Sequence, residues 1–477
     1  MKSKISVGIK ASVVYTIAIL FSKGLSIITV PIFTRLMPTD QIGLVNLYNS
    51  WFAMISSAVT LSLTSGGFQI AMRDFEDTRD EYVSSILSLT IVLALFFLIV
   101  CLLFHKHIEK IIGLDNDFLI MIIIGLIVTP ATEFWLSKNR YEYKYINAAM
   151  LTMGTALVAS LLSVLLVVFS KKNGIVELAK VRLIGNNFVI YLVAFILCVS
   201  ILFKGKTFYN KEYWKFSLSL SIPLVGNSIA VQLLSLADRS MISNMCGNSA
   251  VGIYSTLYSV SSLSSIIWGA INSSFVPFLF SNYDTKGKEK EIKRTANLIL
   301  LLYSIVAFAL TIVAPEIVKI LATKEYYSAI YIMPPIAAGI FMTAVSSMYS
   351  NILIMFKKTQ YIMISSFGAA VINVILNYLF IKQWGYLAAS YTTLIAYTFM
   401  AILQYIVCKH ICLKGLIKNK EIYNDRIIWV LSLLTICFCL LCILLYRFYY
   451  IRILLIFCIC LAIIIYRKKI IYIIRRL

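Results

Sequence analysis

The sequence is poor in charged residues and in the two residues that most often interrupt helices. Only 13% of its 477 residues are charged, and it contains 8 Pro and 20 Gly. Hydrophobic residues make up 60% of the chain, a share with which a soluble protein of this length would precipitate. The apolar runs are each about 20 residues long and do not alternate as barrel strands do. The composition therefore excludes a soluble domain and predicts an all-helical, polytopic membrane protein.

Acidic residues and histidines are also scarce, and the motifs of several enzyme classes are missing. The chain has 21 Asp and Glu, 43 Lys and Arg, and 3 His. It contains no phosphate-binding P-loop, HExxH element or GxSxG element. Most of the 10 Cys lie within apolar runs, where we interpret them as small buried hydrophobes. The sequence thus predicts no enzyme, no metal site and no cofactor.

The apolar runs and the charged breaks between them predict the topology. We expect fourteen spans, centred near residues 23, 53, 93, 127, 158, 190, 227, 266, 307, 343, 371, 397, 436 and 457. With the N-terminus inside, the inside segments hold 29 cations and the outside segments 10, as the positive-inside rule requires. Both termini are therefore predicted to be cytoplasmic. The net charge of +22 reflects this topology and an affinity for anionic lipids, not for nucleic acid.

Two pairs of segments indicate an internal repeat. DQIGLVNLYNSW from Asp40 aligns with SAVGIYSTLYSV from Ser249 at an offset of 209, and NGIVELAKVRLIG from Asn173 aligns with WGYLAASYTTLIA from Trp384 at an offset of 211. Parallel repeats of six spans are typical of transporters with two lobes. We expect lobes at residues 1–203 and 204–408, followed by an additional pair of spans at residues 409–477.

Lys23 lies near the middle of the first predicted span. Its side chain reaches about 6 Å, far less than the roughly 15 Å to either membrane interface, so snorkelling cannot bring its charge to water. An intramembrane charge of this kind is a functional candidate by default. Lys23 and Ser26 fall on one polar stripe of the helix, and Gln232 and Ser235 hold the equivalent positions in the second repeat. The stripes predict a water-accessible cavity, with hydrogen bonding between helices as the alternative for the serines.

Three other cations lie within predicted spans. Arg239 is a candidate for the cavity or for an anchor at the membrane interface, and Arg182 is a second cavity candidate. Lys180 is a weaker candidate, because Glu177 precedes it by three residues and offers a simple ion pair.

Two carboxylates are candidates for coupling transport to an ion. Asp238 precedes Arg239 but points about 100° away from it on the helix, so it need not neutralise that cation. Glu133 lies about one turn inside the inner end of span four, where pairing with Lys138 or Arg140 is the alternative interpretation.

Three segments, taken in order, resemble the Wzx-type polysaccharide flippases of the multidrug/oligosaccharidyl-lipid/polysaccharide exporter superfamily. They are PIFTRLMPTDQIGLVNL after span one, LADRSMISNMCGNSAVGIYSTLY across spans seven and eight, and TKEYYSAIYIMPPIAAG before span ten. The resemblance implies an alternating-access carrier in the bacterial cytoplasmic membrane. It would turn undecaprenyl-diphosphate-linked oligosaccharide to the outer leaflet for O-antigen (lipopolysaccharide) or capsule assembly. It also implies contact with membrane lipids and, as candidate partners, a polysaccharide polymerase and a chain-length regulator.

Lys23 departs from one pattern of this superfamily, since related lipid II flippases use cavity arginines in the first helix. A lysine keeps the charge but not the planar fork that grips phosphate through two bonds. Two rival functions remain open. A multidrug exporter of the same superfamily commonly carries an acidic residue in its first helix, where this chain has Lys23. A membrane polysaccharide polymerase typically has a large outside loop, whereas the longest loops here are predicted to be inside.

Overall fold

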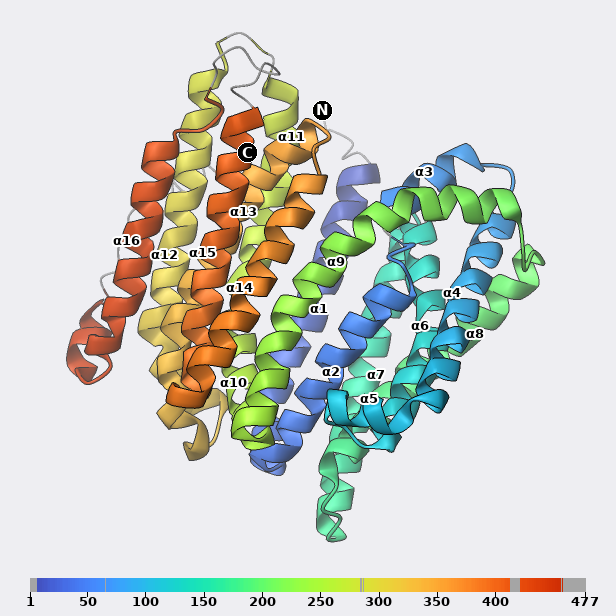
Figure 1. Cartoon of the computed structure of the whole chain (residues 1–477), viewed down its shortest axis with the longest axis horizontal. Helices are drawn as coiled ribbons and strands as arrows, with labels where there is room; N and C mark the ends of the chain where they lie inside the picture. The colour runs from blue at the N-terminus through green and yellow to red at the C-terminus, as the bar shows by residue number, and fades with distance from the viewer. Residues whose placement is uncertain are drawn as a thin grey trace, which may run out of the picture. The chain divides into compact units, whose positions relative to one another are not determined.

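The protein is all-helical in its computed structural model (Figure 1). The structure describes residues 7–64, 66–283, 285, 287–411, 421–455 and 457, and no strand occurs among them. The helices are α1 Val7–Leu36, α2 Thr39–Val59, α3 Gly66–Asp74, α4 Arg79–Leu103, α5 His105–Ile112, α6 Asn116–Tyr141, α7 Tyr145–Lys172, α8 Leu178–Gly205, α9 Lys211–Cys246, α10 Asn248–Ser261, α11 Ser264–Asn282, α12 Glu289–Leu321, the 3-10 helix η1 Lys324–Ile332, α13 Met333–Met355, α14 Gln360–Trp384, α15 Tyr386–Ile411 and α16 Asp425–Leu445.

The helices confirm the predicted fold class, with a smaller number of apolar spans. Eleven described helices are long and apolar enough to cross a membrane, or twelve if the two halves of the bent helix α9 form one span. The count falls short of fourteen for two reasons. Helix α2 has 21 residues but is less apolar, since it carries Asn46, Asn49 and Ser50 among others. The expected span near residue 457 lies almost entirely outside the described residues.

The chain forms two compact units, Met1–Gly252 and Ile253–Leu477. In the first unit α8 is the central helix, because α2, α4, α6 and α7 all pack against it. Gly185 brings α8 close to α7, since a Cβ at this position would lie 2.8 Å from Ser163 Cα. Helix α9 belongs to this unit through contacts with α2, α3 and α4. The boundary between the compact units, after Gly252, thus differs from the lobe boundary at residue 203. The lobe boundary is inferred from the sequence repeat and stays a prediction.

In the second unit α13 is the central helix. It packs against α11, α12, α15 and α16, and 78% of the most apolar stretch of its span is buried. Its aromatic residues Phe341 and Tyr349 belong to a continuous core together with Tyr303 of α12. A helix that is apolar on every side needs such a central place to bury its whole surface.

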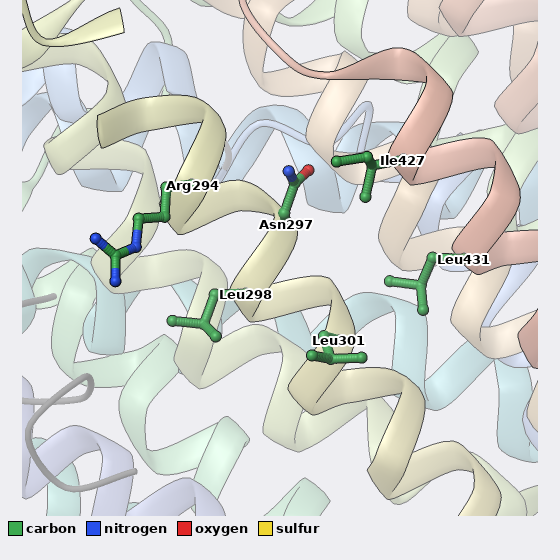
Figure 2. Close-up of a pocket in the computed structure, with 6 residues that line it drawn as sticks. All are labelled: Arg294, Asn297, Leu298, Leu301, Ile427 and Leu431. Atoms are coloured by element: carbon green, nitrogen blue, oxygen red, sulfur yellow. The ribbon is translucent and has the colours of Figure 1, made fainter. Parts of the chain in front are cut away.

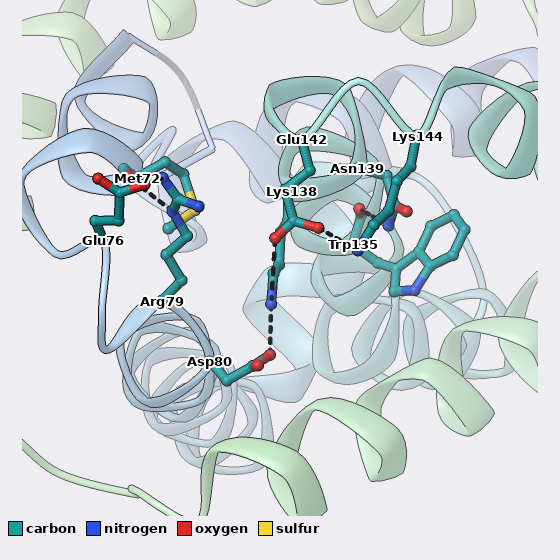
Figure 3. Close-up of polar contacts among 9 residues, drawn as sticks. All are labelled: Met72, Glu76, Arg79, Asp80, Trp135, Lys138, Asn139, Glu142 and Lys144. Carbon is teal, nitrogen blue, oxygen red and sulfur yellow. Dashed lines mark hydrogen bonds and ion pairs between the residues drawn. The ribbon is translucent and has the colours of Figure 1, made fainter.

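An ion-pair network joins the ends of three helices in the first unit (Figure 3). Lys138 of α6 binds Asp80 in the first turn of α4, and its Nζ lies 3.7 Å from Glu142. Glu142 also binds Lys144, which directly precedes α7. Arg79 donates from Nε to the carbonyl oxygen of Met72 at 2.7 Å, which holds the end of α3 against α4. These groups lie at the end of the unit that the charge bias assigns to the cytoplasm.

Two backbone features follow from the local sequence. Helix α9 bends by 51° between Ile222 and Val225, a stretch in which the sequence has Pro223, and a proline inside a helix removes a backbone donor. Gly174 and Gly385, which precede the last helix of each predicted repeat, both adopt left-handed conformations with φ of 76° and 65°. Glycine is the residue that adopts a positive φ at little cost.

Candidate functional site

Lys23 lies on an exposed face of α1. Helix α1 packs against α7 and buries Ala18 and Phe33. Ile17 and Ile28 are 53% and 63% exposed, and at 100° per residue they lie about 120–140° around the helix from Lys23. Lys23 and Ser26 are both exposed. Ile19 and Leu20, each 48% exposed, lie only about 40–60° from Lys23, so the exposed Lys23 and Ser26 share their face of α1 with apolar side chains.

The hydroxyl of Ser26 does not join α1 to another helix. It donates to the carbonyl oxygen of Ser22 at 3.0 Å, within its own helix, and in the described part of the chain it has no hydrogen bond to a second helix. Thr29 in turn donates to the carbonyl oxygen of Ser26 at 2.9 Å. Helix-to-helix bonding thus fails to explain Ser26, and its oxygen lone pairs stay available on this exposed face.

Arg239 joins α9 to α2. Its Nη1 donates to Ser50 Oγ of α2 and to Ser235 Oγ, each at 2.8 Å. Near the other end of α2, Ser62 Oγ donates to Ser228 Oγ of α9 at 3.2 Å. The pairs 50 with 239 and 62 with 228 describe two antiparallel helices in contact along the length of α2, which we call the α2–α9 seam (Figure 1).

The other predicted residues of α9 lie on or beside this seam. Gln232 shares a face with Ser228 and Ser235 at helical spacing, and it is half-buried. Asp238 is only 2% exposed, whereas Arg239 is half-buried. The structure therefore brings Arg239, Ser235 and Gln232 together along one helix and places Asp238 in the interior.

Arg182 and Lys180 lie on α8 outside the seam. The guanidinium of Arg182 stacks 3.8 Å above the ring of Phe33 in α1, a cation–π contact. Lys180 Nζ lies 2.6 Å from Asp117, 3.2 Å from Glu177 and 3.9 Å from Asp115. The charge of Lys180 is thus committed to an ion-pair cluster, which extends the expected pairing with Glu177.

Glu133 is bound by a hydroxyl. Thr64 donates from Oγ1 to Glu133 Oε2 at 3.2 Å, while Lys138 is taken by Asp80 and Glu142 (Figure 3). The expected pairing of Glu133 with Lys138 is therefore absent. Arg140 lies 5.5 Å over the ring of Tyr15 of α1.

A buried hydrogen-bonded network next to the seam escaped the sequence analysis. Asn187 donates from Nδ2 to the hydroxyl of Tyr48 at 3.0 Å, Tyr48 and Tyr191 share a hydrogen bond of 3.0 Å, and Tyr191 donates to the carbonyl oxygen of Met121 at 2.9 Å. Gly125 makes room for this network, because a Cβ there would lie 2.5 Å from the Tyr191 hydroxyl. The available signal was the spacing of Asn187 and Tyr191, two polar groups one turn apart within an apolar helix.

The second unit carries a groove of a different character between α12 and α16 (Figure 2). Aliphatic side chains dominate its lining, with Asn297 and Arg294 as the polar members; the others are Leu298, Leu301, Ile427 and Leu431. Leu301 and Ile427 are more than 40% exposed. None of the predicted site residues lines this groove, and its apolar wall suits hydrocarbon better than a sugar.

Solved structures identify the class of fold. The structure of "Lipid II flippase MurJ, inward closed conformation" matches with a TM-score of 0.68 at 16% identity, over 96% of this chain and 100% of that one. An inward-facing multidrug resistance MATE family transporter of the MOP superfamily matches with a TM-score of 0.62 at 15% identity, over 84% of this chain and 97% of that one. The fold is thus that of the multi-pass transporters of this superfamily.

Sequence comparison identifies the family. The model for "Polysaccharide biosynthesis protein" matches residues 9–283, more than half of the chain, and the MatE model matches residues 223–379. The chain belongs to the polysaccharide biosynthesis protein family. A curated relative, the probable low-salt glycan biosynthesis flippase Agl15 of Haloferax volcanii, is 21% identical over 415 residues, which cover 83% of this chain and 82% of that protein. The family predicted from the sequence is confirmed.

Proposed function

We propose that this protein moves undecaprenyl-diphosphate-linked oligosaccharide from the inner to the outer leaflet of the bacterial cytoplasmic membrane, for O-antigen or capsule assembly. The observation that carries the proposal is Lys23, an exposed cation near the middle of the span that α1 forms, with the exposed Ser26 one turn away. The names of the relatives Agl15 and MurJ as flippases support a lipid-linked substrate.

The chemistry of the substrate explains why a cation belongs at this depth. A diphosphate loses its hydration in hydrocarbon, and Lys or Arg donors in a wet cavity replace the lost hydrogen bonds while the prenyl chain stays in lipid. Lys23 supplies a point charge, and Arg239 supplies a planar fork. Ser26, Gln232 and Ser235 add neutral hydrogen-bonding groups suited to sugar hydroxyls. Alternating access then exposes these groups first inside and later outside.

The remaining assignments complete the proposal. Arg182 stands at the outer part of the cavity, and Lys180 acts there only through its ion-pair cluster. Asp238 and Glu133 are the candidates for ion coupling, because both are carboxylates within the predicted spans of this unit. Both termini are cytoplasmic. Membrane lipids, a polysaccharide polymerase and a chain-length regulator are the proposed partners.

Multidrug export is the second candidate function, favoured by the MatE match over residues 223–379. The two candidates demand opposite charges, since an exporter of cationic drugs gains nothing from a cation at its centre. The charge at residue 23 therefore separates them.

Complementation of a flippase-deficient strain tests the proposal. Lys23→Ala should abolish display of the glycan while the protein reaches wild-type levels on blots, and Lys23→Arg should retain part of it. Lys23→Glu should be worse than Ala, because like charges about 4 Å apart repel by about 4 kcal/mol at an effective dielectric of 20.

Lys172→Ala is the matched control, since Lys172 is an exposed cation at the end of α7, and it should leave display unchanged. Wild-type glycan display from Lys23→Ala at normal expression would refute the proposed role. If Lys23 were instead a packing residue, Ala would be tolerated and the bulkier Arg would be harmful.

A further inference from the structure

Each predicted repeat places a glycine near the start of the helix that follows its first span. Gly43 lies in α2 and Gly252 in α10, 209 residues apart, and both are buried. The charge bias assigns this end of α2 to the outside, and we call it the outer end.

The two glycines make a reciprocal contact through the backbone. A Cβ at Gly43 would lie 1.9 Å from the carbonyl oxygen of Asn248, and a Cβ at Gly252 would lie 2.0 Å from the carbonyl oxygen of Thr39. Thr39 and Asn248 are themselves 209 residues apart, so each half of the contact repeats the other. No side chain fits at either position, and each glycine Cα–H comes within the roughly 3.5 Å reach of a weak bond to the opposite carbonyl.

Side-chain hydrogen bonds hold each half of the contact to its own repeat. Gln41 Oε1 accepts from the backbone N–H of Ala179 at 3.0 Å, which ties the start of α2 to α8. Ser243 donates from Oγ to Asn248 Oδ1 at 2.7 Å, which ties the start of α10 to α9. At the two glycines themselves, in contrast, the nearest atoms of the opposite predicted repeat are backbone atoms. Surfaces without interlocking side chains can separate and meet again without repacking.

The contact continues the α2–α9 seam. Residue 43 meets residue 248, residue 50 meets residue 239 and residue 62 meets residue 228, so a single antiparallel register runs from the outer end inward. Separation at the glycines would therefore uncover Ser50 and Arg239 first. These are the seam residues nearest the outer end and part of the proposed binding surface.

We propose that the Gly43–Gly252 contact is the outer closure of the transport path, made while the cavity faces inward and broken when it faces outward. This inference rests on the proposed function, which it deepens by naming the residues that control outward access. An added methyl group at either glycine prevents the closure and holds the outer end open.

Thiol accessibility tests the inference. Ser50→Cys places a nearly isosteric thiol in the seam, and Cys246→Ser removes the exposed native thiol at the end of α9. Intact cells are treated with a membrane-impermeant maleimide. The same glycine variant without Ser50→Cys gives the background labelling. Labelling should be slow with both glycines present and should rise several-fold with Gly43→Ala and with Gly252→Ala. Gly154→Ala in α7 is the matched control, because nothing lies within 4 Å of a Cβ there, and it should not change labelling.

A second measurement leaves both glycines in place. Thr39→Cys with Asn248→Cys puts two thiols at the contact, and cross-linking them should stop glycan export until the link is reduced. Export that continues after cross-linking, or labelling of Ser50→Cys that stays slow with Gly43→Ala and Gly252→Ala at normal protein levels, overturns the inference. The accessibility change does not depend on the cargo. A normal result from Lys23→Ala would thus refute the proposed substrate and leave the closure standing.

Discussion

The hydrogen bond between Arg239 and Ser50 offers a quantitative test of the α2–α9 seam. Ser50 is 6% exposed, and its Oγ accepts from Arg239 Nη1 at 2.8 Å. A hydrogen bond to a charged group contributes about 1.5–3 kcal/mol. Because Arg239 is half-buried and can recruit water, we expect a value at or below the lower end of that range, about 1–2 kcal/mol.

A double-mutant cycle of Ser50→Ala and Arg239→Met isolates this pair from the other contacts of each residue. Unfolding of the purified protein in detergent provides the readout. In a unit of roughly 250 residues each kcal/mol shifts the midpoint by about 2–4 °C, so Ser50→Ala should lower it by about 2–8 °C. The two substitutions together should cost less than the sum of each alone.

Ser26→Ala is the matched control. Its hydroxyl bonds only within α1 among the described residues, so the midpoint should change by less than about 2 °C, as for a surface substitution of under 0.5 kcal/mol. Strict additivity of Ser50→Ala and Arg239→Met, within about 0.3 kcal/mol, would mean that the hydrogen bond does not stabilise the seam.

Two further predictions concern the interiors of the units. Arg452→Met should destabilise the second unit by about 3–5 kcal/mol in thermal unfolding, because Arg452 is 3% exposed and its loss leaves the Glu316 carboxylate without its ion-pair partner. Adding Glu316→Leu should restore most of the lost stability. If it restores none, this reasoning is wrong. Gly125→Ala should cost about 1–3 kcal/mol by pushing a Cβ to 2.5 Å from the Tyr191 hydroxyl. Gly154→Ala, with open space around it, should be neutral or stabilising by up to about 1 kcal/mol, and equal effects of the two alanines would be inconsistent with crowding at Tyr191.

Features that depend on short stretches of the chain could be predicted from the sequence. The apolar runs locate the helices, because hydrocarbon requires every span to satisfy its backbone internally. The polar stripe of Lys23 and Ser26 follows from helical spacing alone. Arg239 was identified as a cation within a span for the same local reason.

Partners from distant parts of the chain could not be predicted in this way. Ser50 is 189 residues from Arg239, and only the packing of α2 against α9 brings them together. The ion pair of Lys180 with Glu177 follows from a spacing of three residues, whereas Asp117 is 63 residues away and joins the cluster through the packing of α6 against α8. The two aligned sequence segments pair Gly43 with Gly252. The role proposed for these glycines, however, can be inferred only from the distance between their two backbones in the structure.

The predicted repeat matches backbone positions more closely than it matches charge. At the outer end the glycines and their carbonyl partners match at one offset, yet Lys23 corresponds to Gln232 and Arg239 corresponds to Val30. In the proposed closure the matched backbones let the two halves close against each other, while Lys23 and Arg239 each stand where the other predicted repeat has a neutral residue. A symmetric pair of charges would attract an anion equally from both halves. Two non-equivalent cations instead suit an elongated ligand with two phosphates and different ends, which is the character of a lipid diphosphate that carries a sugar chain.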